Sequence, residues 1–165
     1  MVVLGLGSNM PHGRHGAPRR VLVAAVAALA RGGFAVDRVA SVRHTAPMGP
    51  AARSYANSAV LGCWSGDPSA LLRLCKQVER DFGRKAGQRW GARVLDIDIW
   101  LMGRSIVRER GLIIPHMALA SREFALRPLV ELAATWRHPA LGLSARQLLA
   151  RRLRRHKVDF ATTTD

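Results

Sequence analysis

The sequence lacks the marks of a membrane, secreted or disulfide-stabilised protein. Its longest apolar run, residues 21–30, is too short to cross a bilayer, and being alanine-rich and preceded by Pro18 it predicts a buried helix. The N-terminus has no basic segment followed by a long hydrophobic one, so we expect no secretory signal. Cys63 and Cys75 lack CxxC spacing. We therefore expect two reduced thiols in the core and a cytoplasmic protein.

The common nucleotide-binding motifs are missing as well. Glycines follow the first apolar segment in GLGSNMPHGRHG, residues 5–16, but the GK[ST] ending of a P-loop is absent. The same stretch matches GxGxxG poorly, which argues against a Rossmann fold. If a nucleotide binds, arginines and metal ions must therefore hold its phosphates.

Negative charge is scarce. The chain has 11 acidic residues against 26 basic ones, a net charge of +15, and only three of the basic residues are lysines. Such a surface favours polyanions, among them nucleic acid, phosphorylated ligands and nucleotides. Heavy arginine usage is also typical of a GC-rich genome, so composition does not choose among these partners.

Hydrophobic periodicity predicts an element order of β, α, β, β, α, β, followed by helices. The predicted strands are 2–7, 34–44, 55–64 and 94–100; the helices are 18–31, 65–83, 121–136 and 144–155; and a short apolar segment lies at 112–115. This order predicts an α+β fold with a ferredoxin-like split βαβ core and a C-terminal helical addition. We expect one domain over 1–165, with a frayed tail after about 155.

Residues 89–100, RWGARVLDIDIW, place two carboxylates inside an apolar strand. Asp96 and Asp98 share one face, and Leu95, Ile97 and Ile99 point to the other. Their Cα atoms should lie roughly 6.5 Å apart, from a rise of about 3.3 Å per residue. Two such carboxylates repel each other and are costly beside a core unless positive charge lies between them.

Three explanations fit this carboxylate pair. It can form a structural ion-pair network with arginines, bind a hard cation such as Mg²⁺, or supply the acid and base of a glycosidase. The last is disfavoured because the chain has few carboxylates and one tyrosine. Cations that flank the pair without cancelling it favour a metal-bridged polyphosphate. They are Arg84, Lys85, Arg89, Arg93, His116 and Arg122.

Seven motifs follow one another in an order typical of one family. They are GLGSN, TAPMGP, SYAN, VERDFGR, RWGARVLDIDI, IPH and SREFALRPL. Together they resemble the 6-hydroxymethyl-7,8-dihydropterin pyrophosphokinases of folate biosynthesis, over about residues 2–150. The resemblance implies transfer of pyrophosphate from Mg-ATP to the pterin hydroxymethyl group, with release of AMP.

The resemblance also implies roles for individual residues. Asp96 and Asp98 match carboxylates that bind two Mg²⁺ ions, and with Arg84 and Arg93 they form the expected catalytic group. The ATP side is implied to comprise Glu79, Arg84, Lys85, Arg89, Trp90, Arg93, Ile99, His116 and Arg122. The pterin side is implied to comprise Thr45, Pro47, Met48, Tyr55, Asn57 and Phe124, with Tyr55 and Phe124 as the stacking pair. The expected partners are the pterin and ATP alone, without nucleic acid or membrane, bound by a monomer.

Two other functions remain open. A small basic ferredoxin-like domain can bind RNA, but that reading requires RNP-like aromatic strands, and Asp96 and Asp98 would repel a phosphate backbone. A catalytically weakened paralogue kept for a protein contact would bind pterin without turnover. Several implied site residues also have ordinary packing or surface alternatives. They are Trp90, His116, Tyr55, Phe124 and Asn57.

Overall fold

The computed structural model describes residues 1–45, 54–84 and 93–161, with the side chains of the last helix described as far as residue 155. Its strands are β1 (Val2–Ser8), β2 (Ala35–Val39), β3 (Arg43–Thr45), β4 (Tyr55–Cys63), β5 (Asp96–Met102), β6 (Val107–Glu109) and β7 (Leu112–Ile114). Its helices are α1 (Pro18–Arg31), α2 (Pro68–Asp81), the 3₁₀ helix η1 (Leu119–Ser121), α3 (Glu123–Ala133) and α4 (Ala145–Ala161). None of the helices in these ranges is long and apolar enough to span a membrane.

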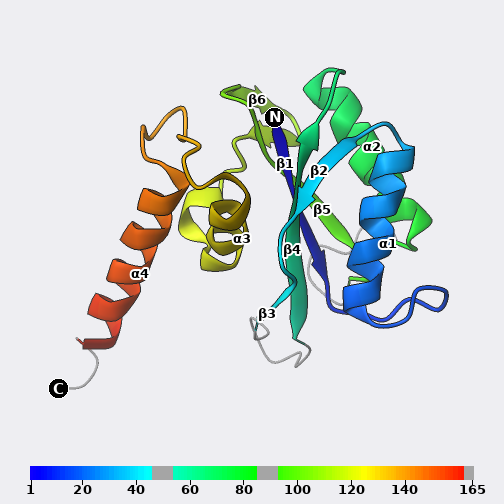
Figure 1. The fold of residues 1–165 in the computed structure, drawn as a ribbon, viewed down its shortest axis with the longest axis horizontal. Helices are drawn as coiled ribbons and strands as arrows, with labels where there is room; N and C mark the ends of the chain where they lie inside the picture. The colour runs from blue at the N-terminus through cyan, green and yellow to red at the C-terminus, as the bar shows by residue number, and fades with distance from the viewer. Residues whose placement is uncertain (46–53, 85–92, 162–165) are drawn as a thin grey trace.

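An antiparallel sheet with the order β2-β4-β1-β5 forms the centre of the molecule, and β3 pairs with β4 beside β2. Helices α1 and α2 cover one face of this sheet, and α3 and α4 lie on the other (Figure 1). Strands β6 and β7 form a separate hairpin. The predicted α+β class, ferredoxin-like core and C-terminal helical addition are confirmed.

The alternation of side chains along β1 divides the core into two clusters. Val2, Leu4 and Leu6 pack against α1 and α2, whereas Val3 joins the cluster on the α3 side. β1 is buried on both faces because it is an interior strand with helices on either side, which explains its nearly continuous apolar sequence. Both faces of the sheet therefore have their own core.

The predicted strand 34–44 is in fact two strands, with a break at residues 40–42. Within the break, the backbone N–H and the hydroxyl of Ser41 donate to Glu131 Oε1 of α3, at 2.7 and 2.8 Å. A side chain from a helix thus replaces a strand neighbour as the hydrogen-bond partner. Because this partner is 90 positions away in the sequence, the local alternation carried no sign of the break.

Other differences concern boundaries and one thiol. The segment 112–115 is the second strand of a hairpin whose first strand, β6, was missed, and the helix predicted over 121–136 is η1 followed by the shorter α3. α4 continues to Ala161, past the predicted end at 155. Cys75 is buried as predicted, and burial with Glu79 nearby raises its pKa to about 12. The core placement of Cys63 was wrong, because this last residue of β4 is exposed.

Gly5 of β1 lies beneath the indole of Trp100. A Cβ built on Gly5 would come within 2.0 Å of that ring, so we expect Gly5→Ala to lower the free energy of unfolding by about 2 kcal/mol through overpacking. Gly13→Ala is the matched control, since an added Cβ there meets no atom within 4 Å and should change stability by less than about 0.5 kcal/mol. Urea denaturation measures both values. Equal stability of the two variants would contradict this packing.

Candidate functional site

Strand β5, at the edge of the sheet, presents Asp96 and Asp98 on the same face as Gly5 and Gly7 of β1. Ile97 and Ile99 point to the opposite face and are buried in the α1/α2 core, as predicted. Burial and the neighbouring Asp96 raise the pKa of Asp98, and coulombic interactions with His116, Lys76 and Arg122 partly offset this rise. Among the described residues, arginines form ion pairs with Asp96, and no cation forms one with Asp98.

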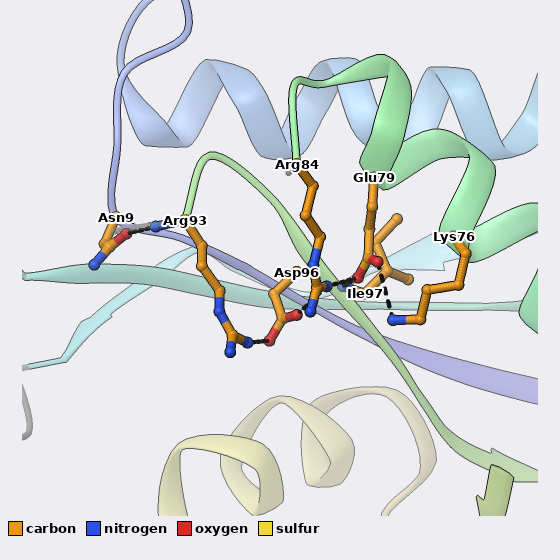
Figure 2. A network of polar contacts seen from close by, with 7 residues as sticks. All are labelled: Asn9, Lys76, Glu79, Arg84, Arg93, Asp96 and Ile97. Carbon is orange, nitrogen blue, oxygen red and sulfur yellow. Dashed lines mark hydrogen bonds and ion pairs between the residues drawn. The ribbon is translucent and has the colours of Figure 1, made fainter. Parts of the chain in front are cut away.

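Asp96 is held between two arginines. Its Oδ1 accepts a hydrogen bond from Arg84 Nη1 at 2.7 Å, and its Oδ2 accepts one from Arg93 Nη1 at 3.0 Å (Figure 2). The expectation that flanking cations leave the pair uncancelled was wrong for Asp96, because each of its oxygens pairs with a guanidinium group. Both arginines are mostly buried at the side chain, 28% and 24% exposed, which strengthens these pairs relative to surface ion pairs.

Glu79 of α2 fixes the position of Arg84. Its side chain is 1% exposed and accepts hydrogen bonds from Arg84 Nη1, from Lys76 Nζ at 2.9 Å and from the backbone N–H of Ile97 at 2.8 Å. A buried carboxylate is stable only when its oxygens are satisfied in this way. Glu79 thus joins α2 to both Arg84 and β5 (Figure 2).

Asn9, directly after β1, fixes the position of Arg93. The two residues pair reciprocally: Asn9 N donates to Arg93 O at 3.1 Å, and Arg93 N donates to Asn9 Oδ1 at 2.6 Å. Asn9 is not among the site residues predicted from the sequence. A signal was present in GSN after the first strand, because asparagine offers both a donor and an acceptor where a strand ends.

Three of the six predicted pterin residues lie on β3 and β4, across β1 from Asp96. Asn57 is 8% exposed, and its Nδ2 donates to Thr45 Oγ1 at 2.8 Å. Tyr55 is half-buried at the start of β4, paired with Thr45 of β3. Three of the predicted pterin residues are therefore neighbours at one end of the sheet.

His116 and Arg122 belong to the segment between β7 and α3, and Phe124 belongs to the first turn of α3. His116 N donates to Trp100 O at 2.9 Å, and its Nδ1 accepts from Ala118 N at 3.2 Å, so a neutral His116 ring carries its proton on Nε2. The guanidinium carbon of Arg122 lies 5.7 Å from the centroid of the Phe124 ring. Coulombic interactions with His116 and Arg122 lower the pKa of Asp98, so both residues act electrostatically on this carboxylate.

Not every predicted site residue reaches the face of the sheet that carries Asp96 and Asp98. The side chain of Ile99 lies in the core on the far side of the sheet, and Glu79 is enclosed by protein groups. Five predictions lie outside the described residues. They are Pro47, Met48, Lys85, Arg89 and Trp90.

The carboxylates of Asp96 and Asp98 fit a hard cation that is coordinated partly by the protein and partly by a substrate. Two carboxylates lie on one face, and the described residues contain no group of three or more histidine, cysteine, aspartate or glutamate side chains that could enclose a metal. Mg²⁺ is commonly held by one or two carboxylates, with the remaining positions filled by phosphate oxygens and water. Transition-metal sites built from protein ligands alone do not match this arrangement.

Comparison with known proteins places the chain in one family. Residues 3–134 match the model of 7,8-dihydro-6-hydroxymethylpterin-pyrophosphokinase (HPPK). The chain is 34% identical over 148 residues to a 2-amino-4-hydroxy-6-hydroxymethyldihydropteridine pyrophosphokinase of Synechocystis, covering 89% of this chain and 73% of the relative. It is 39% identical over 132 residues to a mitochondrial folate synthesis bifunctional protein of Arabidopsis thaliana, covering 79% of this chain but only 23% of that longer protein.

The solved structures support the same fold. A Plasmodium falciparum HPPK-DHPS with pteroate superimposes with a TM-score of 0.72 at 13% identity, covering 97% of this chain and 43% of that one. The sequence match and the architecture thus agree over the sheet and the helices that position the site. The chain belongs to the 7,8-dihydro-6-hydroxymethylpterin-pyrophosphokinase family.

Proposed function

We propose that this protein transfers pyrophosphate from Mg-ATP to the hydroxymethyl group of 6-hydroxymethyl-7,8-dihydropterin, releasing AMP, as a step of folate biosynthesis. The observation that carries the proposal is the carboxylate pair of β5, with Arg84 and Arg93 converging on Asp96 and the pterin-side residues on the strand beyond β1. Family membership and the names of the relatives support it.

Asp96 and Asp98 are the proposed ligands of two Mg²⁺ ions, which when bound neutralise phosphate charge and orient the transferred group. Arg84 and Arg93, which pair with Asp96, are also proposed to bind phosphate oxygens of ATP. Guanidinium groups pair with phosphate in the same forked geometry as with carboxylate. The proposed nucleotide site also includes His116 and Arg122, together with Lys85, Arg89 and Trp90. Glu79 contributes to it through Arg84.

The pterin site is proposed to lie between Tyr55 and Phe124, whose rings can stack on the two faces of a flat heterocycle. Asn57 offers its Oδ1 as an acceptor to the pterin edge, because its Nδ2 already donates to Thr45 Oγ1 and to the backbone oxygen of Tyr55. Pro47 and Met48 are proposed to complete this side. Such a pocket fixes orientation with few polar groups, as expected for a small heterocyclic ligand.

In the proposed reaction, the pterin hydroxyl oxygen attacks the β-phosphorus of ATP in line. A new O–P bond forms, the bond from the β-phosphorus to the oxygen joining it to the α-phosphorus breaks, and AMP leaves with that oxygen. The hydroxyl proton passes to solvent. Positioning and charge stabilisation are sufficient for this chemistry, so no dedicated general base is required.

We further propose that the chain acts as a single-domain monomer in the cytoplasm, with the pterin and ATP as its partners. Its two free cysteines fit a reducing compartment. Contacts between α3 and α4, and between α3 and the sheet, support one domain.

The test is AMP release from Mg-ATP with and without 6-hydroxymethyl-7,8-dihydropterin. We expect one AMP and one pterin pyrophosphate per turnover, no AMP without the pterin, and loss of turnover in EDTA that excess Mg²⁺ reverses. Pterin binding without AMP release would indicate the weakened paralogue. Salt-sensitive RNA binding without Mg²⁺-dependent nucleotide binding would indicate the RNA-binding alternative.

A further inference from the structure

Gly7 of β1 lies at the centre of a row that crosses the sheet between the two proposed substrate sites. In the strand register it pairs with Asn57 of β4 on one side and with Asp96 of β5 on the other. Partners on antiparallel strands project their side chains to the same face. The row therefore consists of the amide of Asn57 on the proposed pterin side, Gly7 without a side chain, and the proposed metal ligand Asp96.

The space above Gly7 is bordered by the side chains of Asn57 and Asp96. A Cβ built on Gly7 would lie 3.5 Å from Asn57 Oδ1 and 4.0 Å from Asp96 Cβ. Asn57 uses its Nδ2 for Thr45 and Tyr55, and no hydrogen bond from a described residue reaches its Oδ1. At Gly5, two residues earlier on the same face, the indole of Trp100 fills the corresponding position. Gly7 is half-buried, whereas Gly5 is fully buried.

The fold itself does not require glycine at this position. The backbone of Gly7 is not among the glycines with positive φ, so an L-residue can adopt its conformation. The contacts that an added methyl group would make, at 3.5 and 4.0 Å, are ordinary van der Waals contacts. Glycine in the interior of a strand weakens the strand and commonly marks a close approach of a ligand.

We propose that Gly7 is a specificity-determining residue, whose missing side chain leaves the passage through which the hydroxymethyl arm of the acceptor reaches the phosphate beside Asp96. This inference rests on the proposed function. The flat ring is held on the Asn57 side, and the arm must cross β1 to meet the nucleotide held on the Asp96 side. A side chain on Gly7 would occupy the volume of that arm.

The experiment compares wild type with Gly7→Ala. For 6-hydroxymethyl-7,8-dihydropterin we expect kcat/KM to fall by about 100-fold, because displacement of the reacting oxygen by about 1 Å has an effect of that size. Binding of 7,8-dihydropterin, which has no arm, should stay at the wild-type affinity, and so should binding of a non-hydrolysable Mg-ATP analogue. Gly13→Ala, whose added methyl group meets no atom within 4 Å, is the control for the glycine-to-alanine change in the chain and should match wild type.

Each outcome decides the question. Equal kcat/KM of Gly7→Ala and wild type would overturn the proposal. An equal loss of affinity for the pterins with and without the arm would also overturn it, since the whole pocket would then have changed. Circular dichroism and the unfolding midpoint of Gly7→Ala are expected to be near those of wild type, and a departure would reveal a folding defect. If Gly7→Ala has such a defect, Gly7→Ser takes its place, and its affinity for the armless pterin is compared with that of wild type. Absence of AMP release from wild type would instead refute the proposed function.

Discussion

Asp98→Asn is expected to lower kcat for pterin-dependent AMP release by about 1,000-fold, the size of effect seen when one preorganised electrostatic contact to a transition state is removed. Asparagine has nearly the same shape as aspartate but no charge, so it retains the packing of β5 while losing the attraction for Mg²⁺. Asp98 is the carboxylate of the pair that is not held between arginines. Its charge is therefore the one most available to a cation.

The same substitution should raise stability in the absence of Mg²⁺ and nucleotide. Burial and Asp96 raise the pKa of Asp98 in the folded state, so folding takes up protons and the ionised group destabilises the native state. The gain of Asp98→Asn over wild type should be small below the ordinary pKa of 3.8, grow as the pH rises toward the higher folded pKa, and be complete above it. Urea denaturation across this pH range, together with the AMP assay, measures both effects.

Asp37→Asn is the matched control for Asp98→Asn. Asp37 lies on β2 with its side chain 65% exposed and forms only a weak pair with Arg38 at 3.7 Å. We expect this variant to retain wild-type turnover and stability, since isolated surface pairs contribute little. A loss of activity in Asp98→Asn accompanied by a loss of stability would show that Asp98 supports the fold, and would contradict its assignment as a metal ligand.

Glu79→Ala should be the most destabilising single change in the site, lowering the free energy of unfolding by about 3 kcal/mol. Glu79 is 1% exposed, and its removal takes one acceptor from the N–H of Ile97, from Lys76 and from Arg84, which retains Asp96. Arg84 also loses the contact that directs it to Asp96. We therefore expect a higher KM for Mg-ATP in the molecules that remain folded at low temperature.

Two variants separate burial from charge in this prediction. Glu123→Ala removes a glutamate that pairs with Arg127 at i,i+4 on the exposed face of α3, and it should cost about 0.4 kcal/mol. Glu79→Gln retains an oxygen for Ile97 N but offers an amide to the cations, so its stability should lie between those of wild type and Glu79→Ala. Equal unfolding free energies for Glu79→Ala and Glu123→Ala would refute a special role for Glu79.

The sequence was sufficient to predict the features that depend on local periodicity. The alternation in 94–100 predicted which face of β5 carries Asp96 and Asp98 and which face enters the core, and the structure has this arrangement. Proline and glycine at the ends of the apolar segments placed α1 and α2 within a few residues. Periodicity is informative here because each of these elements buries one regular face.

Contacts between distant residues could not be predicted in this way. The anchoring of Arg93 by Asn9 joins positions 84 apart, and the acceptor of the Ser41 hydrogen bonds in the break between β2 and β3 is Glu131, 90 positions away. The acidic residue on α2 was placed on the nucleotide side through resemblance alone. Its burial follows from the approach of α2 to the free edge of β5, which no pattern within either segment reveals.

The hydrogen bond from Ile97 to Glu79 also affects self-association. β5 is the last strand of its sheet, and an edge strand with unpaired N–H groups is a template for the addition of a strand from another molecule. Glu79 occupies one of these donors with a buried carboxylate, which a foreign strand could displace only by removing one of the hydrogen bonds of that buried group. The residue that positions Arg84 therefore also protects the strand that carries the carboxylate pair from aggregation.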